Sequence, residues 1–106
     1  MTATIDDVRA ARARAAASHA AALGGASACA ISKSGGSHPA GKFWEGQTAA
    51  LGELQRSGAD DLAAEARRLE AEWRARHVPG GEREAEAYRA GGLEALQPFA
   101  HPGAPA

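Results

Sequence analysis

The chain has 106 residues, a formal net charge of −1 and one cysteine. This length allows one small domain, and the near-zero charge gives no global attraction to nucleic acid or to anionic membranes. A single cysteine excludes an intramolecular disulfide and fits a reducing compartment. No apolar run approaches the roughly 18 residues that cross a bilayer, and arginines interrupt the N-terminal alanines where a signal peptide needs an apolar core. We therefore expect a cytoplasmic protein, and the Ala, Gly and Arg bias suggests a bacterial or phage origin.

The first predicted helix begins at Thr4 or Asp6, either of which can cap it, and runs to about Leu23. Small and apolar side chains recur along one side with helical spacing. Alanine, the best helix former, dominates the segment. Arg12 falls within the same stripe, so the face available for core packing is thin. The glycine pair 24–25 ends this helix.

Residues 24–42 form a break in composition, rich in Gly, Ser and Ala. The stretch around Cys29 offers only one short strand, which has no partner. We predict a flexible loop over 24–42, because unstructured connections of this length are either functional or disordered.

Two amphipathic patterns lie between residues 43 and 77, together with both tryptophans. They predict helices over 43–55 and 61–76, the second capped by Asp60 or Asp61. The link between them is short and contains Gly58, which can take the left-handed conformation that closes a helix. Such a link favours an antiparallel helical hairpin of about 43–77, in which Trp44 and Trp73 are expected to touch.

A weaker helix is predicted over 82–90, interrupted by Gly91 and Gly92 before Leu93 and Leu96. The proline-rich residues 98–106 are predicted to be a disordered tail, so the domain is expected to span residues 1–97. The predicted fold class is all-α, with three to four short helices organised around the hairpin.

A partial phosphate-loop motif is formed by Gly36, Gly41 and Lys42 just before a predicted helix. Phe43 stands where the motif requires the Ser or Thr that holds magnesium, and no credible strand precedes it. We therefore rank phosphate or nucleotide binding here third among the candidate functions.

The sequence gives little indication of a metal site or of a catalytic nucleophile. The four histidines are scattered without the paired spacing of a zinc site, and Cys29 has no third residue to orient a base beside it. We expect no metal, no cofactor and no enzymatic activity.

Three arginines, Arg9, Arg12 and Arg14, cluster on the first predicted helix and could bind phosphates of a nucleic acid. At 100° per residue, however, Arg14 points well away from the other two. A second arginine cluster, at 67–76, is interleaved with glutamates, as in a solvated helix face. Nucleic-acid binding is therefore the alternative function.

Large apolar side chains are few, which predicts a protein that gains stability from a partner. The favoured function is a non-enzymatic protein–protein interaction module that forms a homo-oligomer, such as a small regulator or inhibitor. Its other protein partners cannot be identified from the sequence. The predicted interface residues are the large side chains of the hairpin and the last helix: Trp44, Leu51, Leu69, Trp73 and Tyr88.

Overall fold

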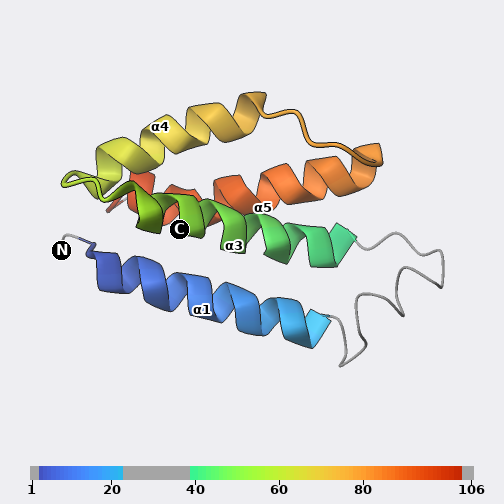
Figure 1. The fold of residues 1–106 in the computed structure, drawn as a ribbon, viewed down its shortest axis with the longest axis horizontal. Coiled ribbons are helices and arrows are strands. Elements are labelled where there is room, and N and C mark those ends of the chain that lie inside the picture. Colours follow the sequence, from blue (N-terminus) through green and yellow to red (C-terminus); the bar gives the residue numbers. More distant parts are fainter. Residues whose placement is uncertain (1–2, 23–38, 104–106) are drawn as a thin grey trace.

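The computed structural model describes residues 3–22 and 39–103. Within these ranges the fold is all-α and consists of four helices: α1 (Ile5–Ala22), α3 (Pro39–Ser57), α4 (Leu62–Ala75) and α5 (Glu82–Ala100). The predicted fold class is thus confirmed. Successive helices run in alternate directions, so that α3 and α5 are parallel while α1 and α4 are antiparallel to them (Figure 1). Most of the predicted loop, residues 24–38, lies outside the described ranges.

Side chains cap two of the helices as the sequence predicted. The Thr4 hydroxyl accepts a 3.4 Å hydrogen bond from the Asp7 backbone N–H, and the Asp7 carboxylate accepts one of 2.8 Å from the Thr4 N–H. This reciprocal arrangement is a capping box. At α4, Asp61 accepts from the Ala64 backbone N–H at 3.0 Å. Gly58 closes α3 in the left-handed region, with φ of 63°.

Helix α3 begins four residues earlier than predicted, at Pro39, so residues 39–42 are helical and do not belong to the loop. Proline is compatible with the first turn of a helix because its φ is already helical and its missing N–H would have no partner there. This places Gly41 and Lys42 on the helix itself.

Helix α5 continues without a break from Glu82 to Ala100, so the predicted interruption at Gly91 and Gly92 was wrong. The domain also extends beyond residue 97, because Pro98 lies within the last turn and Phe99 is 7% exposed. Burial of Phe99 favours the helical turn despite the backbone hydrogen bond that proline cannot donate.

The α3–α5 pair forms the centre of the molecule, and α3 meets α4 much less extensively. A Cβ added at Gly46 would overlap the carbonyl oxygen of Tyr88, and one added at Gly91 would overlap that of Phe43. The two helix backbones therefore touch at this crossing, and only glycine permits the approach.

The two tryptophans pack against different aromatic rings, so the expected Trp44–Trp73 contact was wrong. Trp73 is fully buried and stacks on Tyr88, with ring centroids 5.1 Å apart, and its indole occupies the space a side chain at Gly92 would need. Trp44 instead meets Phe43 edge-on at 5.0 Å. Helix α4 packs mainly on α5, which takes Trp73 away from the start of α3.

Candidate functional site

A groove of about 640 Å³ lies over α3, between α1 and α5. It exists because α1 packs mainly on α3, which leaves a gap between α1 and the end of α5. Its apolar lining comes from all three helices: Ala11, Ala15, Trp44, Leu51, Ala95, Pro98 and Phe99. We call these residues and the space between them the α1–α5 groove.

The structure divides the five predicted interface residues between this groove and the core. Trp44 and Leu51 both line the groove, where Trp44 is half-buried, whereas Leu51 is only 1% exposed and belongs to the buried floor. Leu69 and Trp73 are 4% and 0% exposed, so they have almost no surface to offer a partner, and we assign them to the core. Tyr88 is half-buried beneath the Trp73 ring and lies outside the groove.

Opposite charges stand on the two walls of the groove. Arg14 lines it from α1 and Glu94 from α5, and both are exposed. In the described part of the chain, neither side chain forms an ion pair. The groove is therefore apolar at its floor and has a basic and an acidic rim.

No protein-family model, curated protein or solved structure matches this chain.

The structure separates the three arginines predicted for nucleic-acid binding. Arg9 pairs with Asp6 at 3.1 Å, one turn away on the same helix. Arg12 donates a long 3.4 Å hydrogen bond to Gln55 on the other side of α1 from the α1–α5 groove. Arg14 lines the groove. The three side chains thus do not form one basic surface.

The described part of the phosphate-loop motif is helical rather than a loop. Gly41 is buried in α3, and Lys42 pairs with Glu45 at 3.0 Å. Gly36 lies outside the described residues. Among residues 3–22 and 39–103, no cluster of side chains could hold a metal ion, and no helix is long and apolar enough to span a membrane.

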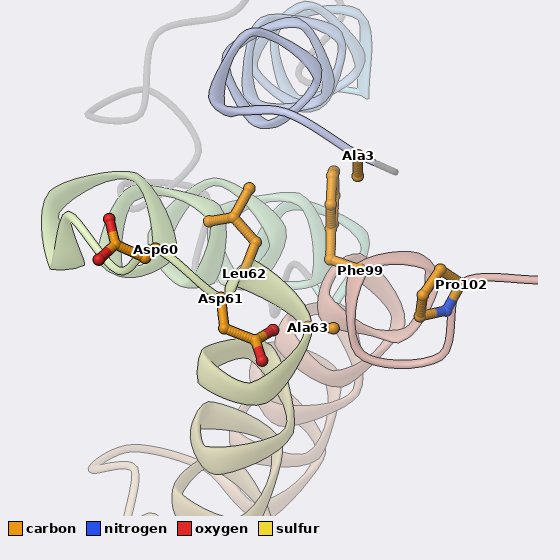
Figure 2. Close-up of a pocket in the computed structure, with 7 residues that line it drawn as sticks. All are labelled: Ala3, Asp60, Asp61, Leu62, Ala63, Phe99 and Pro102. Carbon is orange, nitrogen blue, oxygen red and sulfur yellow. The ribbon is translucent and has the colours of Figure 1, made fainter. Parts of the chain in front are cut away.

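A second hollow, of about 260 Å³, lies where α1 and α4 begin and α5 ends (Figure 2). Two carboxylates line it, but they point in different directions (Figure 2). That of Asp61 already accepts the capping hydrogen bond of α4. The Asp61 carboxylate therefore has a structural role at the start of α4.

A charged network joins α3 to the end of α4. The Glu53 carboxylate accepts two hydrogen bonds from Arg76, at 2.7 and 3.0 Å, and one from the Trp73 indole N–H at 3.2 Å. Arg76 also lies over the Trp73 ring, 4.3 Å from its centroid. Burial alone would raise the pKa of Glu53, but the hydrogen bonds and the charge of Arg76 outweigh it, and the pKa lies below its usual value of 4.5.

The lowered pKa of Glu53 predicts a stability that depends on pH. A carboxylate whose pKa is depressed by folding stabilises the protein above its unfolded pKa, and this contribution disappears as pH falls through the folded value. We expect the free energy of unfolding to fall below about pH 4.5, and to fall less in Glu53→Gln. Urea unfolding at pH 7 and pH 3 measures both. The exposed Glu65–Arg68 pair titrates in both proteins, so its contribution cancels in the comparison. An equal loss of unfolding free energy between pH 7 and pH 3 in the two proteins would contradict the prediction.

The groove residues of α5 were missed because this helix was expected to be interrupted at Gly91 and Gly92 and to be followed by a tail from Pro98. One sequence pattern could have revealed the full length of α5. Apolar or small residues continue at helical spacing from Ala85 through Tyr88 and Gly92 to Leu96 and Phe99, across both the glycine pair and the proline. That continuity predicts one long helix once the glycines are treated as packing positions.

Proposed function

We propose that this protein is a non-enzymatic interaction module, and that a second copy of the same chain docks into the α1–α5 groove. The observation that carries the proposal is the groove itself, in which the half-buried Trp44 faces an open space between two helices that do not close over it. Exposed apolar grooves with polar rims are typical of protein–protein interfaces.

The charges of the groove support a second copy as the occupant. In a two-fold dimer the same surface is used by both chains, so Arg14 of each copy can face Glu94 of the other. The surface of α1 beside the groove carries the exposed alanines Ala10, Ala17 and Ala21. Such small side chains allow two helices to approach closely, and the chain's net charge of −1 opposes dimer formation only weakly.

A charge-reversal series tests this arrangement. The Arg14→Glu substitution changes both copies of the two-fold dimer. Two pairs of like charge, each a glutamate at position 14 against Glu94, then replace the two favourable Arg14–Glu94 pairs. Because exposed pairs contribute about 0.2–1 kcal/mol each, we expect the dimer dissociation constant to rise about tenfold. Sedimentation velocity over a concentration series in low salt measures this constant.

The double variant Arg14→Glu/Glu94→Arg is the matched control, because it restores opposite charges with the positions exchanged. It should recover most of the wild-type affinity, while Glu94→Arg alone should weaken the dimer. The proposal is contradicted if the wild-type chain is monomeric throughout the micromolar range, or if the double variant is as weak as the sum of its two single changes.

A self-associating helical module of this size would act as a small regulator or inhibitor, by presenting a helical surface to a further protein. A cytoplasmic location and a bacterial or phage origin belong to this proposal and are supported by the single cysteine and by the residue composition.

A further inference from the structure

Two arginines that the proposed dimer interface does not use converge on the opposite side of the α1–α3 contact. Arg12 reaches across from α1, and Arg56 lies one turn beyond Gly52 on α3. The position that a Cβ would occupy at Gly52 is 3.0 Å from Arg56 Nη1 and 3.2 Å from Arg12 Nη2. Two positive groups thus approach one point beside Gly52, and they occupy the space that a side chain at this position would need.

Two carboxylates near this pair, Glu53 and Glu45, already have other partners. Glu53 accepts two hydrogen bonds from Arg76 and one from Trp73, although the charge of Arg56 still contributes to lowering the Glu53 pKa. Glu45, further along the cleft, pairs with Lys42. Neither Arg12 nor Arg56 forms an ion pair within residues 3–22 and 39–103, and the remaining residues include no Asp or Glu.

The two arginines open onto a cleft of about 400 Å³ between α1 and α3, which is also lined by His19 and Thr48. Arg12 is half-buried and donates a 3.4 Å hydrogen bond to Gln55, which holds its guanidinium on the α3 side of α1. Like charges held this close repel each other, and an anion between them removes the repulsion and accepts charge-assisted hydrogen bonds from both. Guanidinium groups match the geometry of phosphate oxygens.

We infer that Arg12 and Arg56 form a binding site for a phosphate group in the α1–α3 cleft, separate from the α1–α5 groove. Its ligand is either a small phosphate compound or a phosphate of a nucleic-acid backbone. Arg12 alone of the three arginines predicted for nucleic-acid binding belongs to this site. Arg56 was not predicted from the sequence, because its closeness to Arg12 depends on how α1 packs against α3.

The test follows the arginine Nε–Hε resonances of the labelled full chain by NMR during titration with inorganic phosphate at constant ionic strength. The Arg12 and Arg56 signals should shift together along one saturable curve, while the exposed Arg74 on α4 should shift little. Equal shifts of all arginines, or no saturation, would overturn the inference.

Substitutions distinguish phosphate binding at this site from a general effect of positive charge. Arg12→Gln and Arg56→Gln should each weaken phosphate binding about tenfold, because each removes a charge-assisted hydrogen bond. Arg74→Gln should leave it unchanged. Arg56 is exposed, so its variant remains informative even if Arg12→Gln destabilises the fold. Unaltered phosphate binding in Arg56→Gln would rule the site out.

A parallel titration with a short DNA duplex at the same salt concentration identifies the source of the phosphate. Binding tighter than that of inorganic phosphate, and weakened by the same two substitutions, supports the site and assigns it to a nucleic-acid backbone. Saturable phosphate shifts at Arg12 and Arg56 without any response to the duplex support the site and assign it to small phosphate compounds.

Discussion

Replacing Trp73 with alanine should lower the free energy of unfolding by about 3–5 kcal/mol, the usual range for truncating a buried aromatic residue. The side chain is completely buried, stacks on Tyr88 and donates its N–H to Glu53. Its removal leaves a cavity against the bare backbone of Gly92, which has no side chain to move into the space. Urea denaturation at neutral pH, followed by far-UV circular dichroism, measures the loss.

Trp44→Ala is the matched control, because it deletes the same side chain from the half-buried wall of the α1–α5 groove. It should reduce the stability of the single chain clearly less than Trp73→Ala does, and it should weaken self-association. Comparable losses of stability for the two variants would contradict the assignment of one indole to the core and the other to the groove.

Gly46→Ala should also destabilise the protein severely, even though alanine is intrinsically the better helix former by about 1 kcal/mol. The added methyl group would overlap the backbone carbonyl of Tyr88, which cannot rotate away as a flexible side chain can. Helices α3 and α5 would have to separate along their whole contact. Overpacking of a core typically costs about 1–3 kcal/mol, and we expect the upper end or more, measured as a lower urea midpoint.

Gly52→Ala on the same helix provides the control. The nearest atoms that the methyl group would meet there are the tips of the Arg12 and Arg56 side chains, at 3.0 Å or more, and these can shift. Helix propensity should then dominate and raise stability by up to about 1 kcal/mol. If both glycine variants changed stability in the same direction, the close crossing of α3 and α5 would not be the reason for the glycine at position 46.

The parts of the fold that depend on local chemistry could be predicted from the sequence. The apolar spacing from Leu62 to Trp73 located α4, and Asp61 and Gly58 take the roles expected of a helix cap and a left-handed turn residue. These features need no knowledge of the rest of the chain, because neighbouring residues determine them.

The parts that depend on helix packing could not be predicted in the same way. Gly91 and Gly92 normally weaken a helix, and their presence inside α5 is explained only by the backbone of α3 and the ring of Trp73, which approach from distant parts of the sequence. The Trp44–Trp73 contact was wrongly predicted for the same reason. The sequence does not show that the Trp73 ring packs on α5 rather than on the start of α3.

The candidate groove could be predicted only in part. Trp44 and Leu51 were recognised as large side chains on one helix face, and both line it. Phe99 was assigned to a tail and Glu94 was not singled out, because residues after the glycine pair were not treated as one helix. Leu69 and Trp73 share the amphipathic pattern of Trp44, and only their burial in the folded chain distinguishes them from it.

The position of α5 in the chain bears on how the protein forms during translation. This helix contacts both α3 and α4 and supplies the second half of the glycine crossing, yet it is synthesised after them. Until α5 leaves the ribosome, the nascent chain has α1, α3 and α4 but lacks the surface on which Trp73 packs. Packing of Trp73 is therefore expected to wait until α5 has been synthesised, with the indole accessible to chaperones until then.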